Sequence, residues 1–119
     1  MTDTEYLDRA EALLGAIEAQ CDAIGEGAGI DIDCQRAGGM LTLVFAADGQ
    51  RQLVINQQKP LHEIWLAARA GGYHYRFSEG LWRDTRTGED LFARLSSSAS
   101  DLAGQALVFT PPAAAASQA

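Results

Sequence analysis

The spacing of the apolar residues changes twice along the chain, and this change constrains the fold more than any other feature. Between residues 3 and 24 the apolar side chains recur at the spacing of one helix face, at Tyr6, Ala10, Leu13, Leu14, Ile17, Cys21 and Ile24. Thr2 and Glu5 have the spacing of a capping box at the start of this segment. Glycine occupies every second position from 25 to 29, so the sequence predicts an amphipathic helix over 3–24 that ends at these glycines.

From Ile30 onward the apolar residues alternate with polar ones, which is the pattern of a strand with one solvent-facing side. Asp48-Gly49 is the strongest hairpin signal in the chain, and glycine-containing turns separate the other runs. Consecutive strands joined by tight turns form antiparallel sheets. The sequence therefore predicts an antiparallel sheet of five or six strands, from runs at 30–35, 40–46, 51–56, 63–68, 73–77 and 81–84.

Helical spacing returns near the C-terminus, over about residues 89–102, although the serines at 96–98 are poor helix formers. We expect the apolar segment 107–109 after it to pack on the core. Helices at both ends of a series of strands predict a two-layer α+β sandwich, with both helices on one face of a five- to six-stranded antiparallel sheet. We assign residues 1–110 to this single domain and expect the low-complexity residues 111–119 to be disordered.

The acidic residues are concentrated in the first quarter of the chain. Residues 1–33 carry nine acidic side chains against Arg9 alone, whereas the other 86 residues carry seven acidic and eight basic ones. Phosphate contacts require Lys and Arg, so we expect no nucleic-acid binding. Cations and basic protein surfaces are the expected partners.

Three further features limit where the protein works. No apolar run approaches the roughly 20 residues of a transmembrane helix, so we expect no membrane association. The N-terminal residues are acidic and polar, unlike a secretory signal, so we expect a cytoplasmic protein. Cys21 and Cys34 are too few for a disulfide scaffold and lack the close spacing of a zinc or redox motif, and we interpret them as small buried side chains.

Four carboxylates of the predicted first helix share a face that lies away from its apolar side. At about 100° per residue they fall within about 80° of one another, and they are Asp8, Glu11, Glu18 and Asp22. The following strand adds Asp31 and Asp33 on one side of its pleat, so the two rows can form one ridge. Gly15 occupies the gap in the helical row, so we expect no cation to fill it.

Carboxylates without His or Cys are hard ligands, which suit Mg²⁺, Ca²⁺, Mn²⁺ or iron. The alternative interpretation is an ordinary solvated helix face. Such a face usually carries Lys or Arg four residues from its acids, and these four carboxylates have none, which favours a cation-binding ridge.

The alternation Ile64-Trp65-Leu66 places Ile64 and Leu66 on the buried side of a strand and Trp65 on the outer side. Tryptophan in a strand is more often a core residue, but this alternation favours the outer placement of Trp65. On the outer side, Trp65 is a candidate anchor for a protein partner.

Acid–base chemistry has few candidates in this chain. They are His62 beside Glu63, and His74 with Asp84. The sequence contains neither a nucleophile motif nor a phosphate-binding loop, so we expect a protein that is not an enzyme.

One long segment carries a family resemblance. It leads from an asparagine–glutamine turn at residue 56 through Pro-Leu-His to Trp-Leu-Ala at 65–67, and then into Gly-Gly-Tyr-His at 71–74. This pattern resembles the signature of the bacterial branch of the frataxin family. Matching motifs at Leu81-Trp82 and at 87–89 extend the resemblance over about residues 4–109. The fold that it implies is the one that the spacing predicts.

The resemblance implies a small non-enzymatic protein of iron–sulfur cluster assembly. Such proteins bind iron weakly on an acidic ridge, dock on the complex of cysteine desulfurase and scaffold protein, and modulate its rate. Matched by position, the metal ligands would be Asp3, Asp8, Glu11, Glu18, Asp22, Asp31 and Asp33. The partner-binding residues would be Asn56, Gln58, Trp65 and His74.

From this resemblance we expect the ion to be Fe²⁺ or Fe³⁺, with other divalent cations as surrogates, and the protein to be mainly monomeric with iron-dependent oligomers. The alternative hypothesis is an acidic protein–protein interaction module with no physiological metal role. Iron titration of the purified chain separates the two.

Overall fold

A computed structural model describes residues 1–45 and 51–112. A short 3-10 turn, Lys59–Leu61, separates the third and fourth strands. The helices and strands of the described residues are α1 (Asp3–Ala28), β1 (Asp33–Ala37), β2 (Met40–Val44), β3 (Gln52–Gln58), β4 (Glu63–Ala68), β5 (Gly71–Ser78), β6 (Leu81–Asp84) and α2 (Leu91–Ala103).

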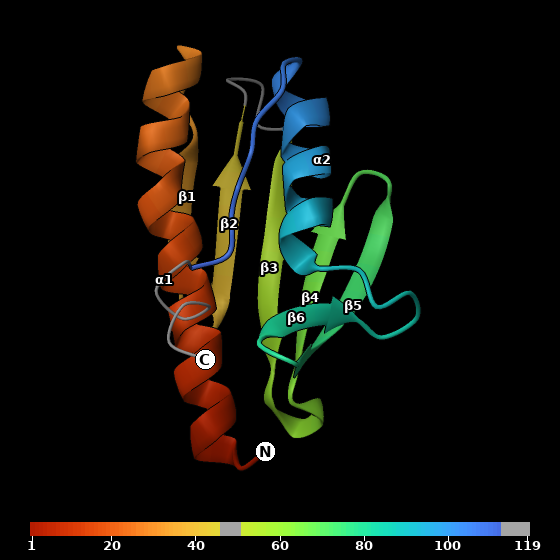
Figure 1. The fold of residues 1–119 in the computed structure, drawn as a ribbon. Coiled ribbons are helices and arrows are strands. Elements are labelled where there is room, and N and C mark those ends of the chain that lie inside the picture. Colours follow the sequence, from red (N-terminus) through yellow and green to blue (C-terminus); the bar gives the residue numbers. More distant parts are fainter. Residues whose placement is uncertain (46–50, 113–119) are drawn as a thin grey trace.

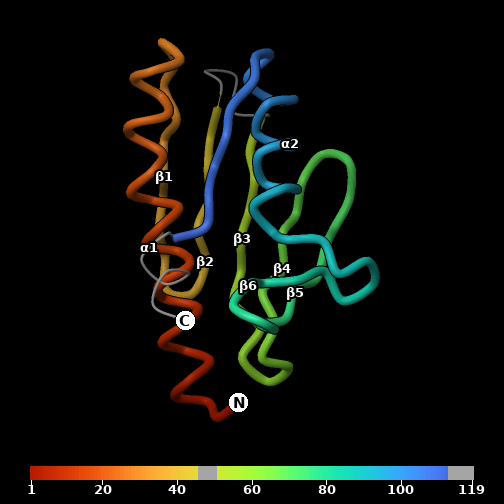
Figure 2. Tube along the Cα trace, in the orientation of Figure 1, coloured from red at the N-terminus to blue at the C-terminus, as the bar shows by residue number. Residues whose placement is uncertain are grey.

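The strands form one antiparallel sheet whose spatial order, β1-β2-β3-β4-β5-β6, is the order in the sequence. Both helices cover the same face, with α1 along β1 and β2 and α2 over the middle of the sheet (Figure 1). The chain after α2 runs back between the two helices (Figure 2). The predicted two-layer α+β sandwich is confirmed, and the sheet of the described residues has six strands, where five or six were predicted.

The core lies between the helices and the sheet. Tyr6 is fully buried, and its hydroxyl donates a hydrogen bond of 2.7 Å to the backbone oxygen of Glu63, which ties the start of α1 to β4. Trp82 is buried beside it, edge-on to the Tyr6 ring. Eight further large aliphatic side chains from α1 and the sheet are fully buried: Leu14, Ile17, Leu41, Leu43, Leu53, Ile55, Ile64 and Leu66.

The helix α1 begins as predicted, with the Thr2–Glu5 capping box, but it ends four residues later than the glycines suggest. Gly25 is buried inside the helix, where an added Cβ would lie 2.9 Å from the backbone oxygen of Ile30. This glycine is needed for close packing and does not end the helix. Gly29 ends it at a φ of 71°, and the amide of Ile30 closes the cap on the oxygen of Gly25 at 3.0 Å.

The first strand was predicted over 30–35 but occupies Asp33–Ala37. Residues 30–32 are held against the end of α1 instead, so Asp31 precedes the strand. The break predicted at Gly71-Gly72 is also displaced, because the turn lies at residues 69–70 and both glycines belong to β5. The predicted hairpin at Asp48-Gly49 lies outside the described residues.

The serines of α2 do not weaken it, because two of them bind the chain that follows. Ser96 and Ser100 are one helical turn apart. Ser96 Oγ accepts from the amide of Phe109 at 2.8 Å, and Ser100 Oγ accepts from that of Leu107 at 2.8 Å. Leu107 and Phe109 are buried, which confirms the predicted packing of this segment on the core. Neither helix of the described ranges is both long and apolar enough to cross a membrane.

Candidate functional site

The carboxylates predicted to form a ridge lie on α1 and at the start of β1, which run side by side at one edge of the sheet (Figure 1). We call Asp8, Glu11, Glu18, Asp22, Asp31 and Asp33 the acidic ridge. All six are at the surface, and Glu18 is half-buried. Asp22 and Asp31 form neither a hydrogen bond nor an ion pair through their side chains within the described part of the chain. Exposed carboxylates of this kind are available to a hydrated cation.

A cation does fill the gap in the ridge, contrary to the prediction. Arg36 of β1 faces α1, where its Nη1 lies 3.0 Å from Glu18 Oε1 and its Nη2 pairs with Glu11. Gln57 Nε2 donates a second hydrogen bond to Glu11, at 3.2 Å. The prediction was wrong because it considered compensating charges only along the helix, whereas this one comes from the neighbouring strand.

The other predicted ligands are dispersed. Asp3 lies at the N-terminal end of α1, where its Oδ1 is 2.7 Å from His62 Nε2, and this hydrogen bond lowers the pKa of the Asp3 carboxyl. Asp33 accepts a hydrogen bond of 2.8 Å from Gln35 Nε2. Within the described ranges, no group of three or more His, Cys, Asp or Glu side chains is arranged to hold a metal ion. The ridge is therefore an open carboxylate surface and not a preformed metal cage.

Hydrogen bonds hold the pKa values of two further α1 carboxyls below the ordinary value of 4.5. The backbone and side chain of Thr2 do so for Glu5, and Arg36 is the main cause for Glu11, followed by Gln57. Because the pKa values of these two carboxyls are lower in the folded chain than in the unfolded chain, their ionised forms stabilise the fold. This contribution is complete above the ordinary pKa and is lost as the pH falls through the pKa values of the folded chain.

We expect the chain to lose stability in acid, and part of the pH dependence of its stability to come from Glu11. In thermal melts at decreasing pH, Glu11→Gln should reduce the loss of melting temperature below about pH 4.5, because a glutamine cannot be protonated there. Glu26→Gln, at another exposed position of α1, is the matched control and should leave the slope as in the parent chain. Equal slopes for both variants would contradict the role of the Arg36 pairing.

The predicted partner-binding residues lie on the sheet face that the helices leave open. Asn56, Trp65 and His74 are directly opposite one another on β3, β4 and β5. The Trp65 and His74 rings stack with centroids 4.3 Å apart and planes 8° apart. Gln58 lies on the same face, two residues after Asn56 on β3. The outward placement of Trp65 is confirmed, while the binding role of these four residues stays a prediction.

Glu63 is a site residue that the sequence analysis did not assign to this surface. It shares the outer face of β4 with Trp65, yet it is only 6% exposed. Its Oε1 accepts from Trp65 Nε1 at 2.9 Å, and its Oε2 accepts from Arg76 Nε at 3.0 Å. His74 Nδ1 lies 3.8 Å from the same carboxylate. Glu63 therefore orients the Trp65 ring, and its position two residues before Trp65 is the signal that places both on one face.

The four acid–base candidates have other roles. His62 is paired with Asp3 and stacks on Tyr6, with ring centroids 5.1 Å apart. Asp84 Oδ1 accepts from the amide of Arg86 at 2.7 Å and that of Thr87 at 3.1 Å, and so shapes the turn after β6. His74 and Glu63 belong to the Trp65 cluster.

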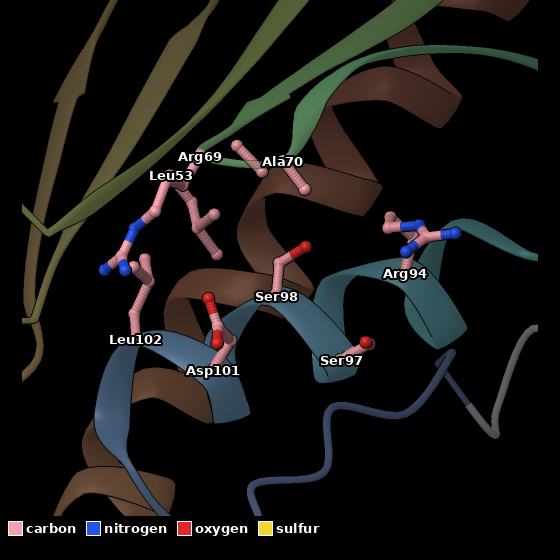
Figure 3. A pocket seen from close by; sticks show the side chains of 9 residues that line it. Leu53, Arg69, Ala70, Arg94, Ser97, Ser98, Asp101 and Leu102 are labelled. Atoms are coloured by element: carbon pink, nitrogen blue, oxygen red, sulfur yellow. The ribbon is translucent and has the colours of Figure 1, made fainter.

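A pocket of about 280 Å³ lies between α2 and the β4–β5 turn, on the helix side of the sheet. Figure 3 shows the guanidinium groups of Arg69 and Arg94 on opposite sides of it, with Asp101 and Ser98 between them. Its charges do not converge on one point, and none of the predicted site residues lines it.

The described residues form an α+β sandwich of two terminal helices over a six-stranded antiparallel sheet, with an acidic first helix and an outward Trp65. The model of the frataxin-like domain matches residues 1–105, and the chain belongs to the frataxin family.

Individual relatives are similar over most of their length. Two proteins named iron-sulfur cluster assembly protein CyaY match 92% of this chain: that of Variovorax paradoxus is 58% identical over 109 residues (97% of that protein), and that of Delftia acidovorans is 55% identical over 112 residues (98%). The solved structure of frataxin from Psychromonas ingrahamii has a TM-score of 0.78 at 34% identity, covering 93% of this chain and 100% of its own.

A more distant solved structure is the trimeric frataxin of the yeast Saccharomyces cerevisiae, complexed with ferrous iron. It has a TM-score of 0.62 at 28% identity, and the match covers 85% of this chain and 87% of the yeast chain.

Proposed function

We propose that this chain is a non-enzymatic component of iron–sulfur cluster assembly in the cytoplasm, which binds iron weakly on the acidic ridge and regulates the complex of cysteine desulfurase and scaffold protein by docking on it. Family membership and the names of the CyaY relatives support the pathway. The observation that carries the proposal is the pairing of an exposed acidic edge with an outward Trp65–His74 stack on one molecule.

Iron binding on the ridge follows from the chemistry of the carboxylates. They are hard oxygen ligands, and exposed side chains spaced along two elements supply few ligands to any one ion. The ion therefore keeps much of its hydration shell, and we expect micromolar affinity with Mn²⁺ or Co²⁺ as surrogates. We expect a monomer without iron and oligomers with it. The ferrous complex of the trimeric yeast frataxin supports iron as the ion.

A paramagnetic titration followed by NMR tests the site. Addition of Mn²⁺ or Fe²⁺ should broaden the amide signals of residues 18–33 first, because Asp22 and Asp31 lie there close to Glu18 and Asp33 in the sequence. Diamagnetic Mg²⁺ at the same ionic strength is the control. Broadening centred on His62 and His74 would contradict the assignment.

The Arg36 ion pairs predict an effect that links stability to cation binding. Arg36→Gln should lower the free energy of unfolding of the metal-free chain by up to about 1 kcal/mol, because Glu11 and Glu18 lose their partner. The same variant should bind divalent cations a few-fold more tightly, since two carboxylates become free. Melting curves with and without Mn²⁺ measure both effects.

Arg86→Gln is the matched control for this pair of measurements. It removes the same charge from the exposed turn after β6, at the opposite edge of the sheet from β1, and it should change neither stability nor cation response. If Arg36→Gln and Arg86→Gln respond equally to Mn²⁺, only the net charge matters and the ridge is not the site.

The second candidate function is an acidic protein–protein interaction module with no metal role. The pairing of Arg36 with Glu11 and Glu18 favours it, because two of the six ridge carboxylates already share one guanidinium. This module would bind the desulfurase complex but show no Mn²⁺-induced broadening and no rise in melting temperature beyond that of Mg²⁺ at equal ionic strength.

A further inference from the structure

The two cysteines of the chain lie together, although 13 positions separate them in the sequence. Cys21 is on α1 and Cys34 is on β1, and their sulfur atoms are 3.1 Å apart. Both thiols are reduced in this structure. Cys21 is 1% exposed, as expected for a small buried side chain, but Cys34 is half-buried and reaches the surface beside the acidic ridge.

The contacts on either side hold these two elements in register. Towards the start of α1, Arg36 pairs with Glu18 at 3.0 Å. Towards its end, Gly25 packs directly against the backbone of residues 30–32. The thiols are therefore positioned by flanking contacts that do not involve them. A disulfide requires the sulfurs to approach by about 1 Å, to a bond length of about 2.0 Å, which side-chain rotation can supply.

We propose that Cys21 and Cys34 form a reversible intramolecular disulfide that joins α1 to β1. The oxidant is a hydroperoxide. The sulfur of Cys34 attacks the terminal oxygen of the peroxide, and the O–O bond breaks. Cys34 becomes a sulfenic acid, and an alcohol leaves, or water where the oxidant is hydrogen peroxide. The sulfur of Cys21 then attacks that of Cys34, so that the S–S bond forms and water leaves. In total the two thiols lose two protons and two electrons, which reduce the peroxide.

The environment assigns the order of the two steps. Cys34 is half-buried and reaches the surface, so a peroxide meets its sulfur first. Cys21 is 1% exposed and its sulfur lies 3.1 Å from that of Cys34, so this thiol is shielded from the peroxide until the sulfenic acid forms.

The bond would fix the two rows of the ridge relative to each other. Asp22 is adjacent to Cys21, and Asp33 is adjacent to Cys34. A cross-link between α1 and β1 also restricts the unfolded chain, so the oxidised monomer should melt at least about 5 °C above the reduced one. This inference rests on the thiols alone, and it stands or falls independently of iron binding and of any partner.

The test uses the purified full chain, treated with hydrogen peroxide and then denatured with an excess of a thiol-alkylating agent. Intact-mass measurement should show a monomer that has lost two hydrogens and takes up no alkyl group, and dithiothreitol should restore two alkylatable thiols. A monomer carrying added oxygen, a disulfide-linked dimer as the main product, or unreacted thiols would overturn the proposal. An unchanged melting temperature of the oxidised monomer would overturn the cross-linking of α1 to β1.

Two serine variants act as controls. Neither Cys21→Ser nor Cys34→Ser should lose the two hydrogens on oxidation. In the native state, Cys21→Ser leaves the accessible thiol and should be alkylated readily, whereas Cys34→Ser leaves the buried thiol and should be protected. Because the parent chain alone gives the deciding mass, the test does not depend on how well either variant folds.

Discussion

Replacing Trp65 by alanine should weaken binding to the cysteine desulfurase complex about 30-fold, almost entirely through faster dissociation. An aromatic anchor at the centre of an interface is worth about 2 kcal/mol or more, which corresponds to this factor. Trp65 has the features of such an anchor, since it faces away from the helices and its ring is held flat against His74. The fold should survive, because Ile64 and Leu66 fill the core on the other side of β4.

Neutral variants of the ridge supply the contrast for Trp65→Ala. Asp22→Asn with Asp31→Asn should lower the association rate and flatten its dependence on salt, because long-range attraction to a basic partner is lost. Trp65→Ala should leave the salt slope intact. Surface plasmon resonance at two ionic strengths measures both quantities. A Trp65→Ala variant that is folded and dissociates at the parent rate would remove Trp65 from the interface.

Replacing Glu63 by alanine should lower the free energy of unfolding by about 2 kcal/mol and also weaken partner binding. The side chain is the hydrogen-bond acceptor for both Trp65 Nε1 and Arg76 Nε, and its loss leaves the half-buried indole N–H without a partner. Without this carboxylate the Trp65 ring is free to reorient, so binding should weaken by less than in Trp65→Ala, which removes the whole ring.

Glu63→Gln is the matched control, because it keeps an acceptor for Trp65 while removing the charge that pairs with Arg76. It should retain most of the binding and lose less stability than the alanine variant. Chemical denaturation measures the stability, and Trp65 fluorescence reports the ring environment. Alanine and glutamine variants that are equally stable would show that the carboxylate does not hold the ring.

The fold was predictable because the apolar spacing is nearly uninterrupted within each element. A helical period, then alternation with tight turns, then a second helical period leaves few arrangements other than two helices over an antiparallel sheet. The errors occur where tertiary contacts override local signals. Gly25 was interpreted as a helix end, but its missing side chain is needed for contact with residues 30–32, which in turn delays the start of β1.

The candidate site was predictable where one element determines it, and not where two meet. Strand alternation was sufficient to place Trp65 outside. The pairing of Glu11 and Glu18 with Arg36 depends on β1 lying beside α1, which no spacing within the helix reveals. The burial of Glu63 likewise depends on Trp65 and on side chains of β5 that cover it.

Reconstituted cluster assembly is the direct test of a regulatory role for this chain in iron–sulfur cluster assembly. The rate of cluster formation on the scaffold protein, driven by the cysteine desulfurase with iron and cysteine, is followed with and without this chain. We expect the parent chain to change the rate at concentrations near its dissociation constant, and folded Trp65→Ala to require about 30-fold more protein for the same change. An unchanged rate at saturating parent chain, with the complex shown to bind it, would contradict a regulatory role in iron–sulfur cluster assembly.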